Sequence, residues 1–304
     1  MDGKKSLFIK AFSDSYFFLE TLKERYKTGG QRISNYRLDT GKEFKDKMKE
    51  NKIELISKCA TLEDLFEMWK EEQINESEGD WEITKGQTEN IKKGTFCIDG
   101  IIDMDHYQKQ NVKVLFITNE ANADGYTKDK PANRICDFRE YYDRGQDCWR
   151  GKMRERICAL YMTITGQFDV APQTVAKDFA FMNLNKRGGT NYVKDGKHID
   201  KYCSIYAPFI KREIELIDPD IIVWLGANTF DMDIHTKYLG AVKEEEKVFM
   251  VLHGKQVPLI RMWHTSATRI NYRKSDKFDN KIIAKLAAKL ADEMKKYYIS
   301  SESL

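Results

Sequence analysis

Residues 112–125, VKVLFITNEANADG, change the character of this chain. The run from Val112 to Thr118 is mostly β-branched, aliphatic or aromatic, which is typical of a strand that is buried on both faces. Polar residues and Gly125 follow immediately. We therefore expect a buried strand whose carboxyl end leads into a loop that carries acidic and amide side chains.

The same texture continues to the end of the chain. Apolar, strand-like runs occupy residues 179–184, 220–226, 248–252 and 258–263. Helical spacing of apolar residues occupies residues 149–166, 202–217 and 280–298. Alternating strands and helices predict an α/β fold with three layers, α/β/α, around a mostly parallel central sheet.

The residues before this part are different. Residues 1–95 are rich in Lys and Glu, and apolar residues recur at helical spacing in residues 16–22 and 62–69. Thr61, with Asp64 in the first turn, is a predicted N-cap. The polar residues 76–94 are expected to form a connecting loop. We expect a helical N-terminal region, 1–95, and an α/β domain, 96–304.

Bulk properties exclude several classes of protein. No stretch of the 304 residues approaches the ~18 apolar residues that span a bilayer. The first residues lack the apolar core of a signal peptide, so we expect a cytoplasmic protein without membrane contact. The six cysteines form no CxxC pair, which favours reduced and mostly buried thiols. The net charge of +3 is uninformative about nucleic acid.

Common cofactor motifs are missing as well. The sequence contains no GxxxxGK[ST], no GxGxxG after the first strand and no GxSxG. The histidines show no HxH or HxxxH spacing, so a metal site is not expected. We predict no cofactor and no metal.

In an open, mostly parallel sheet, ligands bind in the crevice outside the carboxyl ends of the strands. The segments that follow the predicted strands are rich in acid, amide, hydroxyl and cationic side chains. These segments are residues 119–125, 183–189, 226–229 and 264–269.

Four of these pieces, in order, resemble the motifs of the uracil-DNA glycosylase superfamily. ITNEANADG (117–125) is similar to the superfamily's first motif, and FMNLNK (181–186) to its middle Asn-x-x-Lys segment. EIELIDPDIIVWLGANTF (213–230) resembles its P-x-I-I-V-x-L-G strand, and WHTSATR (263–269) its His-Pro-Ser motif. The resemblance covers about residues 96–298.

The motifs also depart from the superfamily pattern. Asn119 replaces the usual Gly, and Asn122 replaces the usual Pro. Ala121 occupies a position that holds a catalytic Asp or Asn in several subfamilies, and Thr265 replaces a Pro. The four-cysteine iron–sulfur pattern of some relatives is missing. These changes leave the target base and the water-activating residue open.

The resemblance implies a monofunctional DNA glycosylase that flips out an altered base and hydrolyses its N-glycosidic bond. Such a reaction needs a carboxylate near the sugar and a donor toward the departing base. Glu120 is the first candidate carboxylate and Asp124 the second, while Asn122 would position water and His264 would face the leaving base. The expected base-binding residues are Asn119, Ala121, Phe138 and Asn183, with Phe138 as a stacking platform.

DNA is the expected partner of a monomeric protein. Residues 253–274 contain Lys and Arg but no Asp or Glu, which suits contact with phosphates. The expected DNA-binding residues are Lys186, Arg187, Ser266, Arg269 and Arg273.

Alternatives remain open at this point. The excised base is uracil or a hypermodified base of the kind found in phage DNA, the latter implying antiviral defence. A structural role is the alternative for two candidates: Glu120 as a surface carboxylate that caps a helix, and Phe138 as a core residue. With Ala121 at a usual catalytic position, a catalytically inactive DNA- or nucleotide-binding protein is the competing hypothesis.

Overall fold

The computed structural model describes residues 50–84, 95–122, 136–137, 139, 152–171, 174–189, 196–226, 233–262 and 278–298. The chain divides into two compact units, Met1–Ile53 and Glu54–Leu304. All elements below belong to the second unit. This unit includes two helices from the predicted helical N-terminal region, residues 1–95. They are α3 (Leu62–Ile74) and α4 (Glu78–Thr84).

Six strand pairings build the central sheet, which has seven strands in the order β2-β5-β3-β6-β9-β8-β7. The four middle strands run parallel, whereas β2, β8 and β7 pair antiparallel with their neighbours. The strands are β2 (Gly100–Ile101), β3 (Val114–Asn122), β5 (Ala180–Gly189), β6 (Ile221–Leu225), β7 (Val242–Glu244), β8 (Lys247–Leu252) and β9 (Lys255–Met262).

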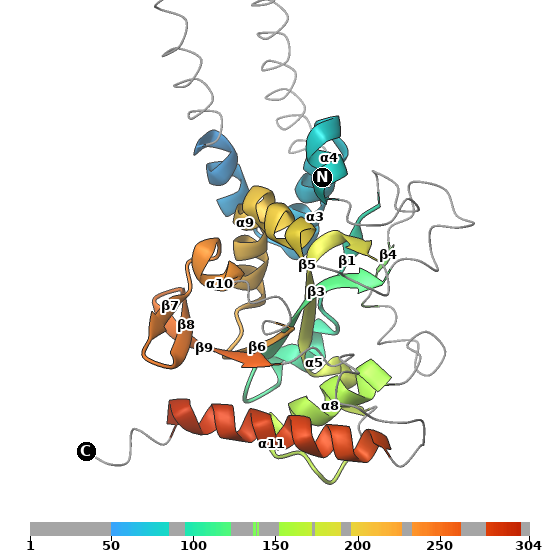
Figure 1. Ribbon diagram of the computed structural model, residues 1–304, viewed down its shortest axis with the longest axis vertical. Helices are drawn as coiled ribbons and strands as arrows, with labels where there is room; N and C mark the ends of the chain where they lie inside the picture. The colour runs from blue at the N-terminus through green and yellow to red at the C-terminus, as the bar shows by residue number, and fades with distance from the viewer. Residues whose placement is uncertain are drawn as a thin grey trace, which may run out of the picture. The chain divides into compact units, whose positions relative to one another are not determined.

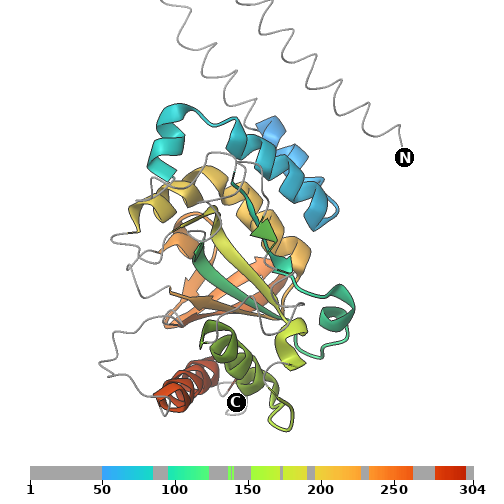
Figure 2. The same ribbon diagram turned by 90° about the vertical axis from the view of Figure 1, so that its right-hand side faces the viewer.

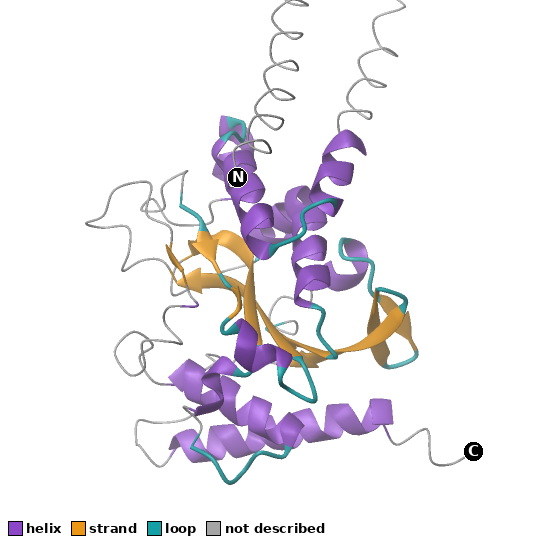
Figure 3. Ribbon diagram, turned by 180° about the vertical axis from the view of Figure 1, so that it is seen from behind, coloured by secondary structure: helices purple, strands orange, loops and turns teal. Residues whose placement is uncertain are grey.

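Helices cover both faces of this sheet (Figures 1 and 2). One face carries α9 (Lys197–Ile217) with α3 beyond it, and the other carries α8 (Lys152–Thr165) with α11 (Phe278–Tyr298). Figure 3 shows the strands between these helices. The remaining short elements are α5 (Met104–Gln108), η2 (Thr174–Lys177), α10 (Ile234–Lys237) and a parallel pair of strands, β1 (Cys97–Ile98) and β4 (Cys136–Asp137).

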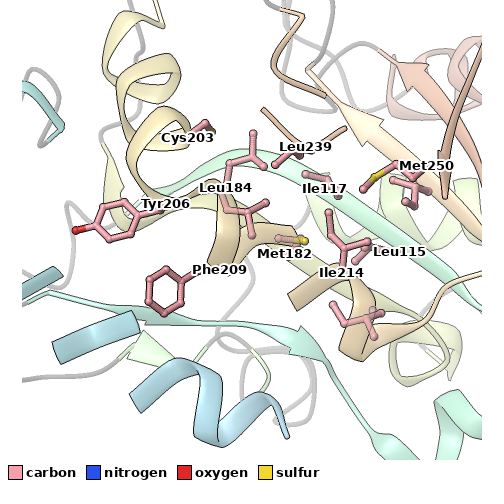
Figure 4. Packing of buried hydrophobic residues seen from close by; sticks show 14 of the residues in the cluster. Leu115, Ile117, Met182, Leu184, Cys203, Tyr206, Phe209, Ile214, Leu239 and Met250 are labelled. Carbon is pink, nitrogen blue, oxygen red and sulfur yellow. The ribbon is translucent and has the colours of Figure 1, made fainter. Parts of the chain in front are cut away.

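Alternation along the strands explains the two covered faces. Leu115 and Ile117 belong to the core under α9, whereas Val114 and Phe116 belong to the core under α8 and α11. Successive side chains of a strand point to opposite faces, so a strand buried on both sides must be apolar throughout. Figure 4 shows part of the first core, which contains strand residues such as Met182 and α9 residues such as Phe209.

The mixed α/β fold, with a central sheet that is parallel in its middle, confirms the prediction at that level. Local signals also hold: Thr61 Oγ1 accepts a hydrogen bond from the Asp64 N–H and caps α3 as predicted. Four cysteines, Cys59, Cys97, Cys158 and Cys203, are buried thiols that form no disulfide.

Two strands run further than the apolar pattern predicts. β3 continues to Asn122 and β5 continues to Gly189, and the two extensions pair with each other. Their hydrogen bonds satisfy backbone groups that a loop would have to expose to water. Asn119–Asn122 and Asn185–Arg187, which the sequence assigned to loops, are therefore strand residues.

Candidate functional site

Glu120 lies near the carboxyl end of β3, opposite Asn185 of β5, and the register between the strands shifts just after this pair. Its side chain is only 5% exposed. Two donors meet on one of its oxygens: His198 Nε2 lies 2.8 Å from Oε2, and Asn185 Nδ2 donates to Oε2 at 3.3 Å. Within the described residues, no donor reaches Oε1. One oxygen of the carboxylate is thus held by two side chains of the described residues.

His198 reaches Glu120 from the first turn of α9. Gly196 precedes this helix with φ of 67°, a left-handed conformation that favours glycine, and it offers no side-chain cap. The contact with Glu120 is therefore made by a side chain at the amino end of a 21-residue helix. The His198 side chain is 10% exposed, so its contact with Glu120 is shielded from bulk water.

Sequence reasoning missed His198 as a site residue. Glu120 and His198 are 78 positions apart, and nothing in the local sequence links them. The available signal was a histidine two positions after a glycine at the start of a long amphipathic helix, which in this topology begins at the carboxyl edge of the sheet.

Asn183 does not offer a free amide edge. Its Oδ1 accepts from Thr118 Oγ1 at 2.5 Å, and its Nδ2 donates to Asp99 Oδ2 at 3.1 Å. Asp99 Oδ2 also accepts from the Asn183 backbone N–H at 2.7 Å, and Asn183 is 1% exposed. The structure corrects the predicted base-reading role, because both ends of the amide are committed inside the protein.

Lys186 is wrong as a DNA contact. Its side chain is fully buried, with its ammonium against the carboxylates of Asp99 and Glu213, the latter at 2.8 Å. The ammonium also lies 5.5 Å from the ring of Phe66 and 5.3 Å from that of Trp69. Burial acts to lower the pKa of Lys186, but the two carboxylates outweigh it and raise that pKa.

Glu213 shares this buried cluster. Burial raises the pKa of Glu213 well above its usual value, although Lys186 opposes the shift. The cluster ties β5 to α9 and to α3. Its charged groups are buried, and a protein core tolerates a buried charge only when the oppositely charged partner is present.

Arg187 is also wrong as a DNA contact, because its side chain is fully buried. Its Nη2 pairs with Glu76, and its Nε donates to Thr84 Oγ1 at 3.1 Å. Both partners belong to the segment from the end of α3 to the end of α4. The positive charge is therefore matched within the protein.

Several predicted site residues are not tested. Asn119 is buried in β3, at 8% exposure. Ala121 and Asn122 belong to β3, but their side chains lie outside the described residues. The remaining candidates also lie outside: Asp124, Phe138, His264, Ser266, Arg269 and Arg273.

The strands that lead to these segments do end at one edge. Ile117 pairs with Trp224, and Trp224 pairs with Arg261, so the three residues share a level across parallel strands. Glu120 follows Ile117 by three positions, and His264 follows Arg261 by three positions. Neighbouring strands are about 4.8 Å apart, so β3 and β9 are separated by roughly 10 Å.

Within the described ranges, the structure contains neither a metal-binding cluster nor a membrane-spanning helix. No group of three or more His, Cys, Asp or Glu side chains is arranged to hold a metal ion. No helix in the same ranges is long and apolar enough to cross a membrane.

Comparison with known proteins adds no assignment: no family model matches this sequence, and no curated protein matches it significantly. Chemically, the arrangement is a shielded carboxylate with one fixed oxygen, in contact with an imidazole. Such a group can orient a water molecule, accept its proton or stabilise a nearby cation.

Proposed function

We propose that this chain is a monofunctional DNA glycosylase of the uracil-DNA glycosylase superfamily. It hydrolyses the N-glycosidic bond of a flipped-out altered base and leaves an abasic site. The observation that carries the proposal is the buried Glu120 carboxylate at the carboxyl end of β3, held through one oxygen by His198 and Asn185.

The topology supports a ligand at this position. From β3 the chain passes through α8 on one face to β5, and then through α9 on the opposite face to β6 on the other side of β3. The connections thus reverse direction around β3. Open α/β sheets bind ligands in the crevice that such a reversal creates outside the carboxyl ends of the strands.

In the proposed hydrolysis, the two carboxylate oxygens of Glu120 have different roles. Breaking the bond between C1′ and the base nitrogen leaves positive charge on the sugar and an electron pair on the base. Glu120 Oε1 would orient a water molecule that adds to C1′ and accept one proton from it. The departing base would gain a proton, with His264 as the proposed donor on that side.

DNA remains a proposed partner, but Lys186 and Arg187 are no longer proposed to contact it. The candidates for phosphate contact are Ser266, Arg269 and Arg273. Two cations of the basic stretch 253–274 have acidic neighbours: Lys255 pairs with Asp220, and Arg261 Nη1 lies 3.5 Å from Asp233. The proposed contact with DNA phosphates therefore rests on residues 263–274 of this stretch.

An alkali-cleavage assay tests the function. Labelled duplex and single-stranded DNA containing uracil, and DNA from phages with hypermodified bases, are incubated with wild type and with Glu120→Gln. Wild type should create alkali-labile sites, and Glu120→Gln should reduce the rate by about 10²–10⁴-fold.

The burial of Glu120, whose side chain is only 5% exposed, favours one competing function, a DNA- or nucleotide-binding protein that has lost the chemistry. If wild type and Glu120→Gln bind DNA equally and neither creates alkali-labile sites on any substrate, that second function is correct. Release of a base by wild type excludes it.

A further inference from the structure

Arg187 joins the candidate site to the α3–α4 segment. The Arg187 side chain extends from the end of β5 into the core and pairs with Glu76, which lies between α3 and α4. Its Nε donates to Thr84 Oγ1 at 3.1 Å, and its guanidinium lies 5.8 Å from the ring of Tyr202. The end of β5 is therefore fixed by residues about 100 positions earlier in the chain.

The backbone of Arg187 completes a path to Glu120. Its N–H donates to Asn185 Oδ1 at 3.0 Å, which fixes the orientation of the Asn185 amide. With Oδ1 occupied in this way, Nδ2 faces Glu120 Oε2 at 3.3 Å. An amide flipped by 180° would place an acceptor against the carboxylate and lose both bonds.

Glu76 also holds the second element of the site. Its other oxygen, Oε1, accepts from the Tyr206 hydroxyl of α9. One carboxylate thus contacts both β5 and α9, the two elements that supply Asn185 and His198 to Glu120. The Glu76 side chain is 5% exposed, so its charge interacts at low local dielectric.

We propose that Glu76 and Arg187 are positioning residues that set the geometry of the Glu120 carboxylate through Asn185. This inference rests on the proposed function, because it assigns a catalytic consequence to that site. Neutralising Glu76 leaves the guanidinium of Arg187 buried with less compensation. The end of β5 then shifts, and a small displacement of a catalytic group costs rate without affecting remote substrate binding.

The test compares Glu76→Gln with Glu78→Gln in the full-length protein. The two variants remove the same charge, but Glu78 is exposed in the first turn of α4. Glu76→Gln should lower kcat at least tenfold with KM within twofold of wild type, and Glu78→Gln should match wild type in both. Glu76→Asp, which keeps the carboxylate, should recover part of kcat. Equal kinetics of Glu76→Gln and wild type would overturn the proposal.

A nuclear magnetic resonance measurement provides a readout that does not depend on activity. The side-chain amide signals of Asn185 should shift in Glu76→Gln and stay in place in Glu78→Gln. If wild type releases no base from any DNA, the proposed function fails, while the Asn185 signals still decide whether Glu76 controls this amide. Unmoved signals would overturn the inference.

Thr84→Val covers the case in which Glu76→Gln does not fold. This variant removes the bond from Arg187 Nε, together with the bonds that the Thr84 hydroxyl donates to the Asp80 and Trp81 carbonyls of α4, and conserves the shape of the side chain. It should lower kcat about threefold to tenfold and shift the Asn185 amide signals. A folded Thr84→Val protein with wild-type kinetics and wild-type Asn185 signals would contradict the proposal.

Discussion

His198 Nε2 lies 2.8 Å from Glu120 Oε2, and this contact joins the first turn of α9 to the end of β3. It brings together two groups that the sequence separates by 78 positions. The contact orients the carboxylate on which the proposed hydrolysis depends.

His198→Gln should lower kcat about 10²-fold, because the carboxylate loses the donor that fixes its position. KM should change little, since His198 holds Glu120 rather than the DNA. Steady-state kinetics on the best substrate measure both constants. His106→Gln is the matched control, because His106 pairs with Asp178 at a half-exposed position away from the site. Equal losses in both variants would remove His198 from the account.

Lys186→Met should destabilise the protein by about 3–5 kcal/mol, because it leaves Asp99 and Glu213 buried without their cation. Urea unfolding measures this change. Lys58→Met is the control: Lys58 pairs with Glu54 at the surface, and its loss should leave the unfolding midpoint nearly unchanged. A Lys186→Met protein with wild-type stability and weakened DNA affinity would restore the phosphate-contact interpretation.

Trp69→Ala should destabilise the protein by about 3–5 kcal/mol. Trp69 of α3 is fully buried and packs against the rings of Phe96, Tyr206 and Phe209. Ile74→Ala, at an exposed position of the same helix, should cost little. A large loss of stability in Trp69→Ala would show that α3 is an integral part of the α/β core. Similar melting temperatures for the two variants would show that α3 contributes little to it.

Acid should destabilise the fold through His235. Burial, with a contribution from the nearby charge of Arg261, lowers the pKa of His235 from 6.5 to about 4. Between these values the unfolded chain binds a proton that the folded protein excludes, so stability decreases as the pH falls from about 6.5 to about 4. His235→Phe removes this proton and conserves an aromatic ring next to Trp224.

Melting temperatures at pH 7 and pH 5 provide the measurement for His235. Wild type should lose more stability between the two values than His235→Phe does. Identical losses would show that His235 is not excluded from protonation in the folded state.

The sequence predicted the elements better than their ends. Runs such as Val114–Thr118 are apolar because both faces of the strand are covered, so local composition carries the information. The polar extensions of β3 and β5 pair with each other, and local composition does not register a partner 65 positions away. Residues 119–122 therefore read as a loop although they are strand.

Burial of charge was the main source of error in the site. The sequence Asn185-Lys186-Arg187-Gly188-Gly189 has the composition of an exposed basic loop. The partners that draw its two cations inside are Glu76, Asp99 and Glu213, which come from three separate parts of the chain. Glu120 was proposed as the candidate carboxylate because its segment resembles the first motif of the superfamily and follows a predicted strand, and its catalytic role stays a prediction.

The most direct test of the central claim is mass spectrometry of free bases released from DNA by the purified full-length protein. Uracil-containing DNA and several phage DNAs are treated with wild type and with Glu120→Gln. We predict that wild type releases one altered base as the intact free base and that Glu120→Gln releases far less of it. Release of no base from any DNA, or equal release by both proteins, would contradict the account.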